Sequence, residues 1–149
     1  MTVAYTDVVK QIADRIKAII LAEIPRFKQA GRFFYRSEPK TTDFAKDDFI
    51  RLQYVNESLG LEESAGKIVY VGFKLHFCTR EFIASPDVLT DMAAHLDALF
   101  GADGYRHDTY WHYLEISSIE YNVVEVPEGV EIGNYSGFVM DLVANRNKI

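Results

Sequence analysis

The sequence predicts a single α+β domain in which an antiparallel or mixed sheet is covered on one face by two main helices. Two segments repeat apolar residues at helical spacing, and several shorter segments alternate apolar with polar residues or are rich in aromatic side chains. Their order is helix, strands, helix, strands, which is typical of this fold class. A length of 149 residues, with 48% hydrophobic and 26% charged residues, suits one globular domain spanning residues 1–149.

The first expected helix begins at a cap, Thr6 or Asp7, and ends near Ile24. Pro25 stops it because proline lacks the N–H that would continue the hydrogen-bond ladder. Its apolar stripe recurs at spacings of three and four and consists of Val8, Val9, Ile12, Ile16, Ile19 and Ile20.

The second expected helix begins at Ser85-Pro86-Asp87, where a capping serine precedes a proline at the first helical position and an acid in the first turn. Gly101 ends it. Its apolar stripe consists of Leu89, Met92, Ala93, Leu96, Leu99 and Phe100. Both helices therefore have one face to bury, and a sheet between them is the natural place.

The clearest strand covers residues 67–79, where one face is apolar with a period of two: Val69, Val71, Phe73, Leu75 and Phe77. The opposite face is mixed and consists of Ile68, Tyr70, Gly72, Lys74, His76 and Cys78. Further strands are expected at residues 32–36, 49–55, within 109–126 and at 137–143. A slip in the alternation at Ser117-Ser118 predicts a bulge.

The remaining segments are expected to be irregular. Residues 37–48 are polar, residues 56–66 have the composition of a long acidic hairpin loop, and Pro127-Glu128-Gly129 is a turn. Residues 144–149 are expected to be a flexible, frayed tail.

Two groups of residues could carry catalytic or metal chemistry. His76 and Cys78 point to the same face of a strand and could form a nucleophilic pair, although a buried, inert thiol is the stronger interpretation. His107, Asp108 and His112, with His95, could bind a metal, but their spacing is that of ordinary loop and strand residues. A small metal- or Cys/His-dependent enzyme is therefore one alternative. A monomeric binding module that uses its aromatic strand faces, with 13% aromatic residues overall, is another.

Several other classes have little support. A net charge of −6 disfavours binding to nucleic acid or anionic lipid through a general positive field, and Arg26, Lys28, Arg32 and Arg36 are better read as a solvated basic rim. No glycine-rich phosphate motif is present, and no stretch has the ~20 apolar residues of a membrane helix. The single Cys78 cannot form an internal disulfide, which favours synthesis in a reducing cytoplasm.

The order and length of these elements resemble those of phage tail terminator proteins of the lambda minor-tail-protein type. The corresponding segments are 7–24, 49–55, 56–66, 67–79, 86–100 and 110–126. The resemblance implies a structural virion protein, not an enzyme, without catalytic residues, metal or cofactor. Six copies would form a homohexameric ring that caps the tail tube and joins it to the neck and head.

The resemblance also implies where the protein works and what it contacts. Its partners would be further copies of itself, the tail tube or sheath protein and a neck protein, with DNA passing through the lumen without specific binding and no membrane involved. It would be located in the virion tail after synthesis in the host cytoplasm. The expected interface residues come from the mixed strand face, the acidic loop and residues 130–149, which extend beyond the usual end of the terminators. They are Tyr70, Lys74, His76, Leu59, Leu61, Glu62, Glu63 and Tyr135.

Overall fold

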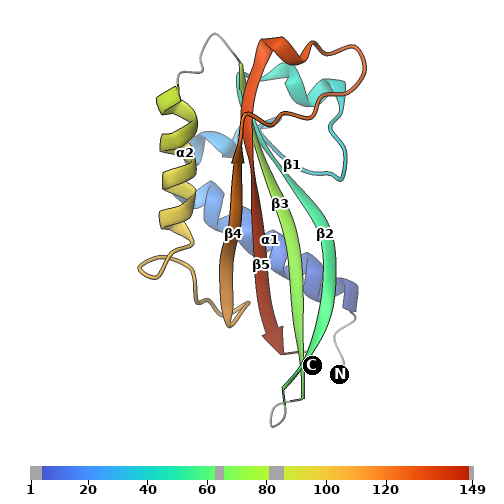
Figure 1. Cartoon of the computed structure of the whole chain (residues 1–149), viewed down its shortest axis with the longest axis vertical. Helices are drawn as coiled ribbons and strands as arrows, with labels where there is room; N and C mark the ends of the chain where they lie inside the picture. The colour runs from blue at the N-terminus through green and yellow to red at the C-terminus, as the bar shows by residue number, and fades with distance from the viewer. Residues whose placement is uncertain (1–4, 63–65, 81–85, 148–149) are drawn as a thin grey trace.

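The computed structural model describes residues 5–62, 66–80 and 86–147 as one α+β domain, as predicted (Figure 1). The elements in chain order are α1 (Tyr5–Glu23), η1 (Pro25–Lys28), β1 (Phe33–Tyr35), η2 (Thr41–Ala45), β2 (Asp48–Glu62), β3 (Gly66–Arg80), α2 (Pro86–Leu99), β4 (Tyr113–Tyr121), η3 (Ile132–Asn134) and β5 (Tyr135–Asn147). No helix in the described part of the chain is long and apolar enough to cross a membrane.

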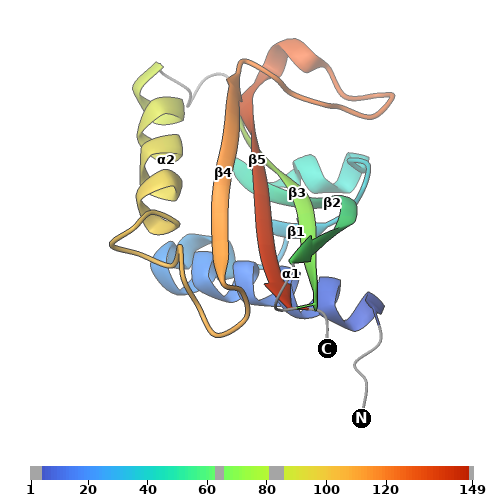
Figure 2. The ribbon, with the colours of Figure 1, turned by 60° about the horizontal axis from the view of Figure 1, so that its bottom comes forward.

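The strands form one mixed sheet in the order β1-β2-β3-β5-β4 (Figures 1 and 2). The short β1 lies parallel to β2, and all other neighbours are antiparallel. The last strand, β5, lies between β3 and β4, so β4 is the outer strand on one side. On the other side the outer strand is the three-residue β1, which leaves most of the outer edge of β2 uncovered by a described strand.

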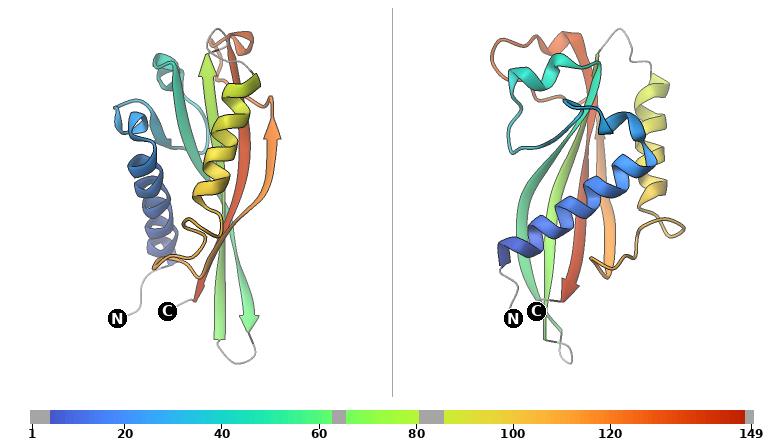
Figure 3. Two further views of the ribbon diagram at one scale, coloured as in Figure 1. Left: turned by 90° about the vertical axis from the view of Figure 1, so that its left-hand side faces the viewer. Right: turned by 180° about the vertical axis from the view of Figure 1, so that it is seen from behind.

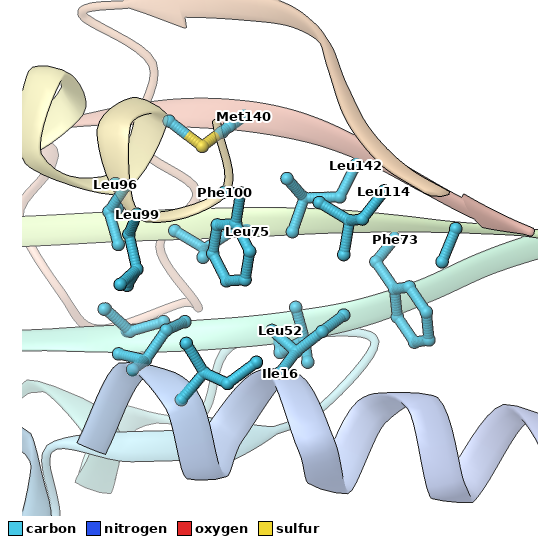
Figure 4. Close-up of a cluster of buried hydrophobic side chains, with 14 of the residues drawn as sticks. Ile16, Leu52, Phe73, Leu75, Leu96, Leu99, Phe100, Leu114, Met140 and Leu142 are labelled. Atoms are coloured by element: carbon cyan, nitrogen blue, oxygen red, sulfur yellow. The ribbon is translucent and has the colours of Figure 1, made fainter. Parts of the chain in front are cut away.

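Both helices pack on the same face of this sheet (Figure 3, right). The α1 stripe is buried as predicted, except that Val9 is only partly buried, and the α2 stripe is buried in full. Figure 4 shows Ile16 of α1 and Leu96 of α2 pointing at the same layer of strand side chains, which includes Leu52, Leu75 and Met140. Each such aliphatic side chain contributes roughly 1.5–3 kcal/mol when it leaves water, so this layer is the main source of stability.

The predicted acidic loop at residues 56–66 is wrong in its secondary structure. β2 continues to Glu62 and pairs with β3 down to the Glu62–Gly66 pair, so the two strands form a long hairpin arm. A bulge between Tyr54 and Asn56 breaks the alternation along β2. The polar residues Asn56, Glu57 and Ser58 made this part of β2 look like a loop, although the backbone ladder needs no apolar side chains and the β3 residues beside them, Val69 and Val71, are buried in the core.

The predicted frayed tail is also wrong, because β5 continues through Asn147 and pairs with β3 up to the Ile68–Asn147 pair. Ala144 is completely buried in the core. Residues 148–149 lie outside the described residues. The expected strand within 109–126 is shorter than that span, at Tyr113–Tyr121, and the bulge predicted at Ser117-Ser118 is confirmed by a register shift between Ile116 and Ser118.

Candidate functional site

The face of the sheet opposite the helices is the first candidate surface, and we call it the open face. Adjacent strands place its residues in rows: Arg51, His76, Val139 and Glu120 form one row, and Gln53, Lys74, Asp141 and Ser118 form the next. Its charges have both signs, and Ser118 donates a hydrogen bond to Asp141 at 2.6 Å. Neither α1 nor α2 covers it (Figure 3, left), although Phe44 of η2 and the connector between β4 and β5 pack over one end, at Phe49 and Cys78.

The structure places four of the expected interface residues on the open face, three of them together on β3. Tyr70, Lys74 and His76 all lie on the open face of β3. Tyr135 of β5 lies on the same face at the other end of the sheet, opposite Arg80, where its ring packs 4.9 Å from that of Phe44. There it belongs to a small apolar cluster that covers this end of the open face.

Three of the other four expected residues, Leu59, Leu61 and Glu62, belong to the hairpin arm. The backbone pairs Leu59 with Val69, Leu61 with Lys67 and Glu62 with Gly66, which places all three in β2. Glu63 lies outside the described residues.

His76 is a buried histidine of the open face. Its ring Nε2 lies 2.8 Å from Gln53 Oε1, and only 6% of the residue is exposed. Burial, reinforced by the positive charge of Arg51, lowers the pKa of His76 from 6.5 to about 4. The imidazole is therefore neutral at neutral pH, which suits a packing role better than proton transfer.

This shift predicts a pH-dependent stability. Because the unfolded chain binds a proton on His76 near pH 6.5 and the folded chain only near pH 4, the contribution of His76 is complete above pH 6.5 and is lost as the pH falls toward 4. We expect a loss of about 3 kcal/mol across this window, at 1.4 kcal/mol per pKa unit. Urea unfolding at the upper and lower ends of this window measures the loss in the free energy of unfolding. This loss should be smaller for His76→Gln than for the parent. A His95→Gln variant, changed on an exposed helix position, should keep the full difference.

Cys78 does not form the nucleophilic pair considered from the sequence. Its side chain is buried beside Phe44 and Phe49, and burial raises the pKa of the thiol to about 12. A thiol that stays protonated at neutral pH is a poor nucleophile. The environment of Cys78 is that of a buried, inert thiol.

The residues considered for a metal site have structural partners. Arg15 donates two hydrogen bonds to the carboxylate of Asp108, at 2.9 and 3.0 Å, which ties this loop to α1. His107 Nδ1 lies 2.7 Å from the carbonyl oxygen of His112, and His95 stands exposed on α2. Within residues 5–62, 66–80 and 86–147, no group of three or more His, Cys, Asp or Glu residues could hold a metal ion.

The basic cluster near β1 is largely neutralised by acidic neighbours. Arg26 and Arg32 both bind the carboxylate of Asp48, and Arg36 lies 3.3 Å from the buried carboxylate of Asp43. These ion pairs fix η2 and the start of β2 to the preceding segment.

Sequence reasoning missed a buried arginine at one end of the open face. The Arg51 side chain is only 2% exposed and donates hydrogen bonds to the carbonyl oxygens of Ser37 and Arg36, at 2.9 and 3.3 Å. Its third partner is Glu125, at 2.9 Å, in the long connector between β4 and β5. Arg51 thereby fixes this connector over the end of the open face. No short-range pattern could reveal it, since Glu125 is 74 residues away.

Removing this carboxylate should destabilise the protein more than its exposure suggests. Although 52% of the Glu125 side chain is exposed, Glu125→Gln leaves the buried Arg51 cation without its counter-ion, and we expect a loss of about 1–3 kcal/mol. Chemical denaturation measures it. Glu128→Gln, an exposed glutamate in the same connector, is the matched control and should cost less than about 0.5 kcal/mol. Equal effects of the two substitutions would show that the Arg51–Glu125 pair does not hold the connector.

The two outer edges of the sheet are the second candidate surface. β1 pairs only with residues 50–52 of β2, so β2 has no strand partner on its outer side beyond Leu52 within the described residues. The outer edge of β4 is covered at its start, where the Leu114 N–H donates to the Arg106 carbonyl at 2.8 Å. Beyond that point no described strand covers it. Large side chains stand exposed at both edges, with Tyr54 and Val55 on β2 and Tyr121 on β4.

A groove of about 380 Å³ lies between α1 and the β2 edge. Val9 and Ala13 of α1 and Leu52 and Phe73 of the sheet line its apolar part, and Lys10 and Ser37 supply polar groups. Tyr35 at its rim donates a hydrogen bond to the Ala13 carbonyl at 2.9 Å, and burial together with the charge of Asp14 raises the pKa of this tyrosine. The groove is therefore braced by contacts between β1 and α1.

Comparisons with known proteins give only a distant likeness. No protein-family model and no curated protein matches the chain. A solved structure named "Np_888769.1" aligns over 91% of this chain and 96% of its own, with a TM-score of 0.49 and 11% identity. A likeness at this level carries no argument about function, so function has to be argued from the surfaces described above.

Proposed function

We propose that this protein is a structural subunit that assembles with copies of itself into a closed ring and terminates a phage tail tube, joining it to the neck. In this role it has no catalytic site. Its partners are its own copies, the tail tube or sheath protein and a neck protein, and DNA passes through the lumen without specific binding. Its working location is the virion tail.

One observation carries the proposal: a single sheet has two unlike outer edges, neither fully paired in the described part of the chain. Contacts between two unlike surfaces repeat from copy to copy and close into a ring when the rotation between copies allows it. The open face, with its mixed charges, is a further surface that a ring can present to its lumen or to a neighbouring tail component. The resemblance in element order to tail terminators supports the choice of role.

Light scattering during size exclusion tests the ring directly. We expect a species near six times the 17.0 kDa of one chain, with closed rings visible by negative-stain electron microscopy. The rings should also bind one end of purified tail tubes and stop further tube growth. A protein that remains a monomer at high concentration, also when tail tubes are present, would refute the proposal.

A further inference from the structure

We infer that the ring interface is an intermolecular strand pair: the outer edge of β4 in one copy pairs antiparallel with the free edge of β2 in the next, and Tyr121 enters the groove between α1 and β2. This inference rests on the proposed ring and names the surfaces that form it. The segments concerned are residues 115–121 of β4 and 54–60 of β2.

The topology allows only one orientation for such a joint. Within one chain β2 and β5 run in one direction and β3 and β4 in the other, because every neighbour from β2 to β4 is antiparallel. If unlike edges meet and the helices of both copies stay on one side of the joined sheet, β4 must meet the next β2 antiparallel. This is the same pairing mode that the sheet already uses.

The exposed tyrosines fix a starting register. Tyr54 is paired with Phe73 and Tyr121 with Phe138, so both tyrosines belong to the helix-covered face, at opposite edges of the sheet. They are 43% and 41% exposed. Placing Tyr121 opposite Tyr54 of the next copy buries both rings on that face. The groove that Tyr54 lines then accepts the Tyr121 ring, with Lys10 and Ser37 as polar partners for its hydroxyl.

From this starting pair, the faces of the two strands match along the whole joint. Each segment has seven residues and one bulged residue, Val55 in β2 and Ser117 in β4. With the bulged residues set aside, six pairs remain in which both members lie on the same face of the sheet. They are Tyr54–Tyr121, Asn56–Glu120, Glu57–Ile119, Ser58–Ser118, Leu59–Ile116 and Gly60–Glu115.

Charge also favours this register, since none of the six pairs sets a carboxylate against another. Sliding the strands by two residues in one direction brings Glu62 opposite Glu115, which is unfavourable. Sliding them the other way carries Tyr121 past Tyr54 to Leu52, where β1 already occupies the edge. Where the pairing ends, Arg106 lies against β4, close to the acidic end of the neighbouring β2.

Disulfide trapping tests the register, because the single native Cys78 is buried and leaves introduced cysteines as the reactive thiols. Ser58→Cys and Ser118→Cys in one chain should, under mild oxidation, give covalent multimers up to the full ring on a non-reducing gel. The matched control pair, Asn56→Cys with Glu115→Cys, lies on the same face but four residues out of register and should give at most a tenth of the product. If rings form but the Ser58→Cys and Ser118→Cys pair cross-links no better than this control, the inferred interface is wrong, whereas the proposed ring is still supported.

Substitution of Tyr121 tests the groove. Tyr121→Ala should raise the concentration at which rings dissociate at least tenfold, while leaving the thermal unfolding of the separated subunit within a few degrees of the parent. Tyr110→Ala removes an equally exposed tyrosine away from the joint and should leave the dissociation concentration unchanged. Equal behaviour of the two variants would contradict the assignment of Tyr121 to the groove, and absence of rings in the parent would overturn the proposed function itself.

Discussion

Replacing Gly137 by alanine should lower the free energy of unfolding by about 3 kcal/mol, the upper end of the usual cost of overpacking. Gly137 lies in β5 opposite Cys78 of β3. A methyl group at its Cα would lie 2.1 Å from the Phe77 carbonyl oxygen and 3.3 Å from the Cys78 Cα. These are backbone atoms of the central strand, so they cannot move aside without disturbing the ladder that joins β3 to β5.

Denaturant unfolding followed by circular dichroism measures this effect. Gly133→Ala is the matched control, because it makes the same chemical change four residues earlier, at a site with no atom within 4 Å of the new methyl group. We expect the control to stay within about 0.5 kcal/mol of the parent. If the two variants are equally stable, then β5 does not approach β3 as closely as described.

The second large effect is expected at Trp111, the only tryptophan of the chain. It is 2% exposed, packs in the main core and donates its indole N–H to the Tyr105 carbonyl at 3.0 Å. Trp111→Ala should cost about 3–5 kcal/mol, because it leaves a large cavity and an unpaired carbonyl. Trp111→Phe should recover more than half of that loss, since it keeps most of the buried area.

His112→Ala changes the adjacent exposed side chain and serves as the control for Trp111. Circular dichroism should be the probe, since the substitutions at Trp111 remove the fluorophore. A loss below about 1 kcal/mol for Trp111→Ala would mean that the loop after α2 is not anchored by this residue.

Periodicity predicted the elements that bury one face along their whole length. The stripes of α1 and α2 and the alternation of β3 all face one core, and each of them repeats over several turns or residue pairs. The bulge at Ser117-Ser118 was also visible, because a slip in alternation is a local signal. The placement of Tyr70, Lys74 and His76 on one face follows from the same period of two.

The features that sequence reasoning missed depend on contacts between distant segments. The arm of β2 beyond Val55 begins with Asn56, Glu57 and Ser58, which interrupt the apolar alternation although they pair fully with β3. β5 inserts between β3 and β4, an order that no local pattern encodes, and this order alone decides which strand edges remain free. The pairing of Arg51 with Glu125 likewise requires the connector to fold back over β2.

The bulges at Val55 and Ser117 have a consequence for solubility. A long, regular strand edge is a template on which any extended chain can grow, and fibrous aggregates start in this way. Both outer strands of this sheet are irregular near the middle of their free stretches, so a generic extended segment finds only a few consecutive backbone partners there. The bulges thus disfavour open-ended growth on unrelated extended segments, whereas a neighbouring copy can still pair along the joint because its own strand also carries one bulged residue, which keeps the two segments equal in length.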